Sequence, residues 1–113
     1  QLVSQWKRED GTIPLIQLAG DWEETFTSYQ VGAERGGLDV ALPPELFNKL
    51  SEGLAEKVQG AVEQGISPAI VTSSRRRRFL RTLTRAKGIV APVFSYEEIG
   101  LDAHPSLVGV VAA

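Results

Sequence analysis

Short apolar segments of strand length alternate with amphipathic helical segments in this chain, and this alternation limits the fold more than any other feature. The predicted strands are apolar and rich in β-branched residues: Ile13–Leu18, Pro68–Thr72, Val90–Phe94 and Leu107–Val111. The predicted helices between them show helical periodicity or capping residues: Trp22–Tyr29, Pro43 to about Gln64, Ser73 or Ser74 to about Lys87, and a single turn at Tyr96–Ile99. The order predicts an α/β fold, a small mixed, partly parallel four-stranded sheet packed with about three helices.

Signals at the ends of these segments support the assignment. Asp21 is a candidate N-cap for the first helix, because its carboxylate can accept a hydrogen bond from a free backbone N–H. Gly65 and Gly88 follow the second and third helices, where glycine readily adopts left-handed backbone. Pro92 lacks the N–H of a ladder donor, which predicts a sheet edge or a bulge in the third strand.

The helical periodicity also predicts the core. Trp22 and Phe26 recur on one side of the first helix, and the second helix has a continuous apolar stripe. We expect five side chains in particular to be buried: Trp22, Phe47, Leu50, Leu80 and Val93. The segment Val31–Asp39 has three glycines and no periodicity, which predicts a mobile surface loop.

The 113 residues suffice for one globular domain, and no apolar run approaches the length of about 18 to 20 residues that spans a bilayer. The chain lacks an initial Met, and Leu2, Val3 and Trp6 have helix-face spacing. We therefore interpret it as a fragment, with residues 1–11 as a helix end and linker and residues 12–113 as one subdomain. It has no Cys, which excludes disulfides and thiolate sites and is compatible with the cytoplasm.

The charge is strongly polarised along the sequence. Seven of the twelve cationic residues lie between positions 75 and 87, which leaves five against fourteen carboxylates, a net charge of −9, elsewhere. These seven are the candidate protein-contact residues: Arg75, Arg76, Arg77, Arg78, Arg81, Arg85 and Lys87. The alternatives are an ordinary solvated helix face and a nucleic-acid surface, although few aromatic residues accompany the cluster.

The residues do not favour catalysis or cofactor binding. His104 is the single histidine, and its loop neighbours Asp102 and Ser106 are unlike a converging triad. Adjacent carboxylates such as Glu97 and Glu98 diverge by about 100° on a helix and are poorly placed to share a proton. The glycines near Gly36 have neither the preceding strand nor the following Lys-Ser/Thr of a phosphate loop. We expect no enzyme activity, no cofactor and no metal site.

Several ordered motifs resemble the C-terminal part of the flagellar and virulence type III export-gate family. They are Asp10–Pro14, Trp22-Glu23, Gly65–Ser73, then Arg77, Leu80, Arg81 and Leu83, then Val93–Ile99, and finally Val108–Val111. Together they cover nearly the whole chain. The third helix departs from the family pattern, which commonly has Pro at the position of Ser74, an aliphatic residue at Arg76 and an acidic residue at Arg85.

The resemblance implies the last subdomain of a cytoplasmic docking platform. The complete protein would have an N-terminal half within the bacterial inner membrane. This fragment would be attached to the membrane only through that half. Its partners would be neighbouring copies in a ring of nine, export chaperone and cargo complexes, and other export-apparatus proteins, not nucleic acid. The alternative is a stand-alone α/β binding domain that uses residues 75–87 for an acidic partner or nucleic acid.

Overall fold

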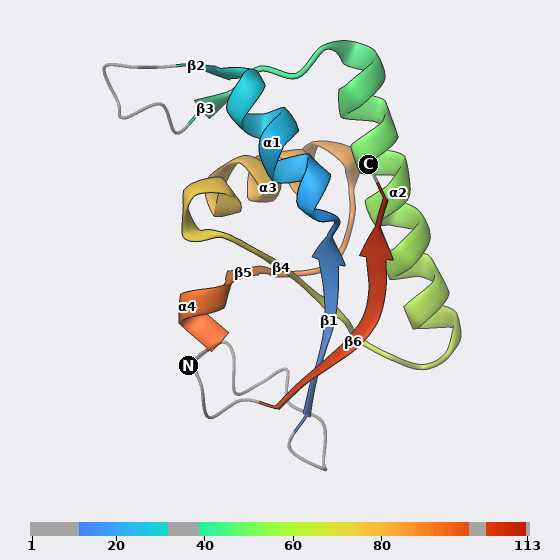
Figure 1. Ribbon diagram of the computed structural model, residues 1–113. Coiled ribbons are helices and arrows are strands. Elements are labelled where there is room, and N and C mark those ends of the chain that lie inside the picture. The colour runs from blue at the N-terminus through green and yellow to red at the C-terminus, as the bar shows by residue number, and fades with distance from the viewer. Residues whose placement is uncertain (1–11, 32–38, 100–103, 113) are drawn as a thin grey trace.

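The computed structural model describes residues 12–31, 39–99 and 104–112 (Figure 1). The described elements are β1 Thr12–Leu18, α1 Gly20–Ser28, β2 Gln30–Val31, β3 Asp39–Val40, α2 Pro44–Glu63, β4 Ala69–Thr72, α3 Ser74–Lys87, β5 Val93–Ser95, α4 Tyr96–Ile99 and β6 His104–Val111. The predicted elements occur in the predicted order, with two additional short strands, β2 and β3. The predicted helix end and linker within residues 1–11 lie outside this part of the chain. The predicted α/β class is confirmed.

The four main strands form one sheet in the order β5-β4-β1-β6 (Figure 1). Every neighbouring pair is parallel, so the sheet is more uniform than the mixed arrangement that the sequence alone indicated. The register between β1 and β6 shifts once, between Leu15 and Ile16. A connection between two parallel strands must cross over the sheet. Helices α2 and α3 lie within such connections, and each therefore packs against the sheet.

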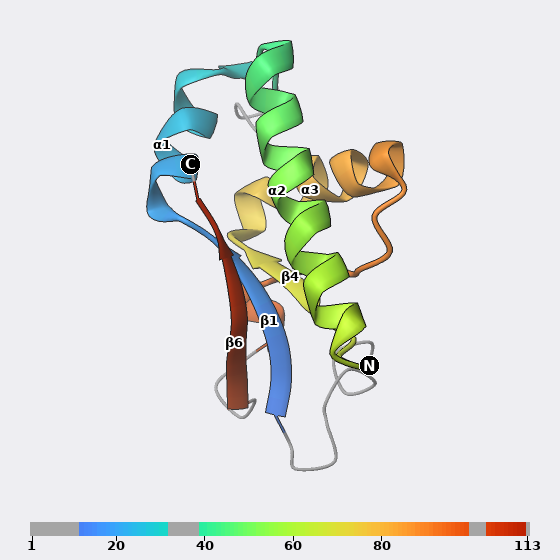
Figure 2. The ribbon, with the colours of Figure 1, turned by 90° about the vertical axis from the view of Figure 1, so that its right-hand side faces the viewer.

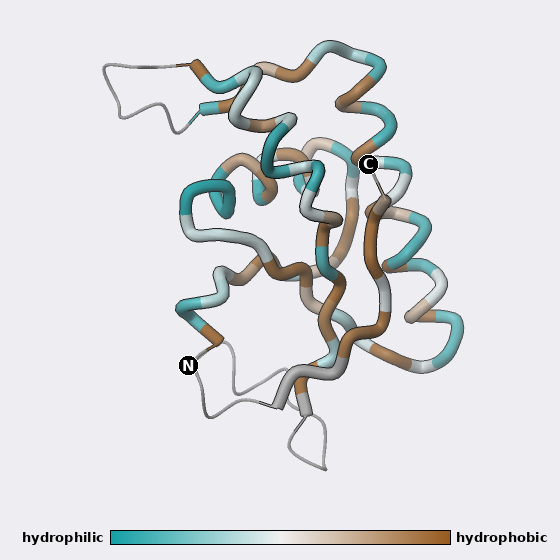
Figure 3. Tube along the Cα trace, in the orientation of Figure 1, coloured by the Kyte–Doolittle hydropathy of each residue, from teal (hydrophilic) through white to brown (hydrophobic). Residues whose placement is uncertain are grey.

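The larger core lies between one face of the sheet and helices α1, α2 and α3. Alternate strand residues such as Ile16, Ile70 and Val93 are buried there against Leu54 and Leu80. Figure 2 shows α2 alongside the sheet, and Figure 3 shows hydrophobic positions concentrated on the strands. The opposite face carries a second cluster: Ile13, Leu15, Ala69, Val71 and Phe94, with Ile99 of α4 packed against it.

The predicted core residues are almost all buried. Trp22, Leu50, Leu80 and Val93 are confirmed, whereas Phe47 is half-buried at the margin of the larger core. The indole Nε1 of Trp22 also donates a 3.1 Å hydrogen bond to a backbone carbonyl just after β6. This bond ties the start of α1 to the end of the last strand.

The two predicted glycine terminators end their helices as expected. Gly65 and Gly88 have φ values of 77° and 67°. The amides of the residues that follow them donate to Ala61 and Thr84, in each case at 2.9 Å, and satisfy carbonyls at the helix ends. The third predicted strand is at an edge of the sheet, as expected, but it begins at Val93, so Pro92 precedes it instead of lying within it. The Pro92 carbonyl accepts a 2.8 Å hydrogen bond from the amide of Ile70.

Other boundaries differ from the sequence predictions. Asp21 is not an N-cap, because α1 begins at Gly20, two residues before the predicted start, and Ala19 holds the cap position. The last strand begins at His104, so the predicted polar loop through His104 was wrong in its backbone conformation. The ends of the predicted loop Val31–Asp39 form the antiparallel pair β2–β3, a contact that local periodicity does not reveal; residues 32–38 lie outside the described part.

Candidate protein-contact surface on helix α3

Helix α3 has one side in the core and another facing outward. Leu80, Leu83 and Thr84 are buried, and Arg76 is buried with them. Arg75, Arg78, Arg85 and Lys87 are exposed, and Arg77 and Arg81 are half-buried. We define the basic surface as the six outward cations: Arg75, Arg77, Arg78, Arg81, Arg85 and Lys87. Figure 3 shows the start of α3 in the hydrophilic colour.

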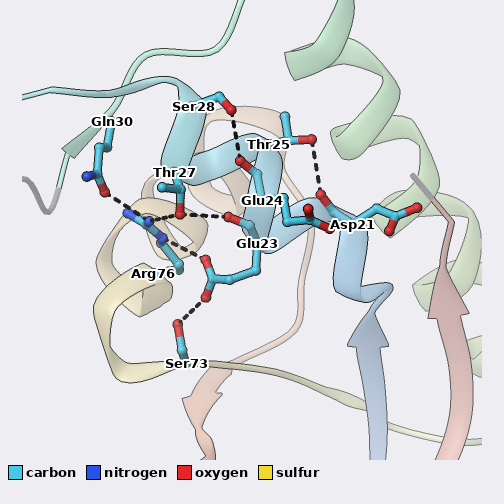
Figure 4. Close-up of polar contacts among 9 residues, drawn as sticks. All are labelled: Asp21, Glu23, Glu24, Thr25, Thr27, Ser28, Gln30, Ser73 and Arg76. Carbon is cyan, nitrogen blue, oxygen red and sulfur yellow. Dashed lines mark hydrogen bonds and ion pairs between the residues drawn. The ribbon is translucent and has the colours of Figure 1, made fainter.

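Arg76 is a correction to the predicted contact set. Its side chain is only 2% exposed, so a partner cannot reach it on this folded chain. Its Nε lies 2.9 Å from Oε2 of Glu23 on α1, whose side chain is half exposed. Its Nη2 donates to Thr27 at 3.3 Å and to Gln30 at 3.1 Å (Figure 4). Arg76 therefore joins α3 to α1 and to the first residue of β2.

The same carboxylate also holds the start of α3. Oε1 of Glu23 accepts a 2.9 Å hydrogen bond from the hydroxyl of Ser73 (Figure 4). Ser73 is at the N-cap position of α3, as predicted, but its hydroxyl makes no capping bond. The guanidinium of Arg76 also lies 6.0 Å from the centre of the Phe26 ring, so the aromatic core adds a cation–π contact.

The sequence contained a signal for the burial of Arg76. Positions 76, 80 and 83 have the spacing of one helix face, and Leu80 was predicted to lie in the core. A charged residue at such a position needs a partner when it is buried. The carboxylate that serves this purpose lies 53 residues earlier, which the sequence pattern does not indicate.

Two members of the basic surface already have partners within the chain. Arg77 Nε lies 3.2 Å from Oε1 of Glu98. Glu98 also accepts a hydrogen bond from the amide of Ser95, and its own amide donates to the Ser95 hydroxyl, the reciprocal arrangement of a capping box for α4. Lys87 Nζ lies 5.4 Å from the centre of the Phe47 ring.

The other arginines are unpaired within the described residues. Arg75, Arg78, Arg81 and Arg85 make no ion pair with any of them. Arg78, Arg81 and Arg85, together with Ser74, Arg77 and Thr82, line an outward hollow of about 470 Å³. An anionic group in this hollow would meet several guanidinium groups at once, which makes this the strongest candidate contact site.

The described residues offer little for catalysis or metal binding. No three His, Cys, Asp or Glu side chains among them lie together as metal ligands. Glu97 and Glu98 are engaged separately: Glu97 accepts a 3.4 Å hydrogen bond from Ser74, and Glu98 pairs with Arg77. The side chain of His104 lies outside the described residues.

Comparison with known proteins identifies the family. The model of the FHIPEP family matches residues 1–104 of the chain. This chain belongs to the FHIPEP family. The FHIPEP chain is 29% identical over 111 residues to the flagellar biosynthesis protein FlhA of Caulobacter vibrioides, a match that covers 98% of this chain and 16% of that protein. The predicted export-gate resemblance is confirmed.

Solved structures share the fold. The nonameric SctV-C of EPEC matches with a TM-score of 0.76 and 13% identity, over 97% of this chain and 32% of that one. The Chlamydia pneumoniae CdsV protein in complex with CdsO matches with a TM-score of 0.72 and 19% identity, over 97% of this chain and 31% of that one. The FHIPEP chain thus spans about a third of these structures and a smaller share of FlhA. No helix within the described ranges has the length and hydropathy to cross a membrane.

Proposed function

We propose that this chain is part of the cytoplasmic docking platform of a flagellar type III protein-export gate, at the cytoplasmic face of the bacterial inner membrane. There it takes part in ring assembly and in binding export chaperone and cargo complexes, without chemistry of its own. The observation that carries the proposal is the family match over residues 1–104. The shared fold with SctV-C, a nonamer, supports a ring of copies.

The basic surface on α3 is the part of this chain that we propose contacts another protein. Arg75, Arg78, Arg81 and Arg85 carry charge that no described residue neutralises, while the rest of the chain is acidic. Such a patch speeds encounters with acidic protein surfaces and favours one orientation of docking. The family match favours this role over a stand-alone domain that binds nucleic acid.

A third class of partner is another protein of the export apparatus. The CdsV protein, which contains the same fold, was solved in complex with CdsO. We propose that this chain likewise contacts an export-apparatus protein besides its own copies and the cargo.

Deletion of residues 12–113 from the full-length protein tests the proposal. Secretion of flagellar cargo into the medium and co-purification of chaperones should both fall to background, while the shortened protein still reaches the membrane at a normal level. Export and chaperone binding at the undeleted level would contradict the proposed function.

His104→Ala in the full-length protein is the control. We assign no proton transfer to His104, so this variant should export at the normal level. Complete loss of export by a folded His104→Ala protein would contradict the absence of chemistry.

A further inference from the structure

Arg81 and Arg85 line two neighbouring hollows. The first is the outward basic hollow, where they lie with Arg77 and Arg78. The second, of about 410 Å³, lies between α3 and the segment that leads into β5. Because the two hollows share these arginines, they form one continuous surface, which we call the α3–β5 groove.

The two parts of the groove differ in chemistry. The first has cationic side chains and the hydroxyls of Ser74 and Thr82. The second has, beside Arg81, Thr84 and Arg85, an apolar wall of partly exposed side chains: Ile89, Ala91 and Pro92. Val90, beside this wall, is 90% exposed. An apolar side chain placed there would be partly removed from water, which favours its binding.

The geometry points to an acidic segment of another protein, with an apolar side chain among its carboxylates, as the ligand of the α3–β5 groove. Its carboxylates would pair with Arg78, Arg81 and Arg85, and its apolar side chain would lie against the wall of Ile89 and Pro92. Arginine suits such pairing because its planar guanidinium donates two parallel hydrogen bonds to one carboxylate. This inference rests on the proposed function, since it specifies the partner of the same basic surface.

A second copy of this chain is a poorer ligand than a separate acidic segment. The exposed carboxylates of α2, such as Glu52 and Glu56, lie along a hollow that Lys49 and Lys57 also line. These lysines would face the arginines of the groove and repel them. Single-stranded nucleic acid also fits poorly, because the ring of Phe94, the one aromatic residue that lines the groove, is buried and offers no stacking surface.

Peptide binding to the full-length protein in lipid nanodiscs tests the inference. The probe is a fluorescein-labelled peptide with three glutamates on each side of one leucine, and fluorescence anisotropy measures its affinity. Arg81→Glu with Arg85→Glu should weaken binding at least about tenfold. Lys49→Glu with Lys57→Glu, two α2 residues outside the basic surface, changes the total charge equally but leaves the groove unaltered, and should stay within about twofold.

Two altered peptides and a change of salt separate the contributions of charge and apolar contact, and a DNA oligonucleotide tests the alternative ligand. A peptide with glutamines in place of the glutamates should not bind measurably, and one with serine in place of the leucine should bind several-fold more weakly. Raising the salt concentration from about 0.1 to 1 M shortens the Debye length from about 10 to 3 Å, and it should strongly reduce the affinity for the acidic peptide. A single-stranded DNA oligonucleotide should bind more weakly than the acidic peptide at equal salt.

Several results would overturn the inference. These are an equal loss of peptide affinity in the two double variants, an affinity that does not change when the leucine is replaced, tighter binding of the DNA than of the peptide, or self-association through the groove that excludes the peptide. Its failure is distinct from that of the proposed function. If deletion of residues 12–113 abolishes export but the groove variant binds the peptide normally, only the inference is wrong; groove-dependent binding with normal export after the deletion contradicts the proposed function instead.

Discussion

The two sides of α3 place the same residue type in opposite environments. Arg76 is enclosed between α1 and α3, and three side chains of another part of the chain accept its hydrogen bonds. Arg78, two residues later, is exposed and lines the α3–β5 groove. Position around the helix decides between a structural and a contact role, because residues two apart point about 200° apart. A run of four arginines is therefore not one functional unit.

The largest effect expected from this comparison is at Arg76. Arg76→Glu would bury a second carboxylate beside Glu23 with no cation between them, and should destabilise the chain by at least about 3 to 5 kcal/mol. Arg76→Met removes the charge but retains much of the volume, and should cost considerably less. Urea unfolding of both variants measures the difference. If the two variants are equally stable, the ion pair between Arg76 and Glu23 does not stabilise the packing of α3 against α1.

A smaller but clear effect is expected at Leu80, which lies on the same side as Arg76. Leu80→Ala should cost about 2 to 5 kcal/mol, because the side chain is fully buried in the larger core. Thr82→Ala on the outward side should change the free energy of unfolding by less than about 0.5 kcal/mol. Urea melts that give similar costs for both would mean that the two sides of α3 are assigned incorrectly.

The smallest change in stability is expected for the exposed arginines. Replacing Arg75, Arg78 and Arg85 together by Glu should leave the melting temperature unchanged or raise it, since Arg81 and Arg85 repel each other at i, i+4 by a few tenths of a kcal/mol. In the full-length protein the same variant should reduce export or ring assembly, and partner binding should weaken as salt rises. Normal export together with salt-independent binding would make these arginines an ordinary solvated face.

Much of the fold could be predicted because its signals are local. Each of these signals depends on residues within a few positions of one another. They are the apolar stripe of α2, the helix ends at Gly65 and Gly88, and the edge strand that Pro92 predicted. The position of the basic surface was also predicted, since six of the seven cations point outward or lie half-buried. Family motifs with fixed spacing then indicated the export-gate relationship, which the FHIPEP match confirmed.

The sequence by itself determined the order of the main helices and strands, which faces are apolar and where the charge is concentrated. Only the tertiary structure decided that Arg76 leaves the basic surface, that Val31 pairs with Asp39, and that Arg81 and Arg85 border an apolar wall. The reason is the range of the interactions involved. Helical periodicity and glycine conformation act between near neighbours, whereas the burial of a charge depends on a partner such as Glu23, which the fold brings from 53 residues away.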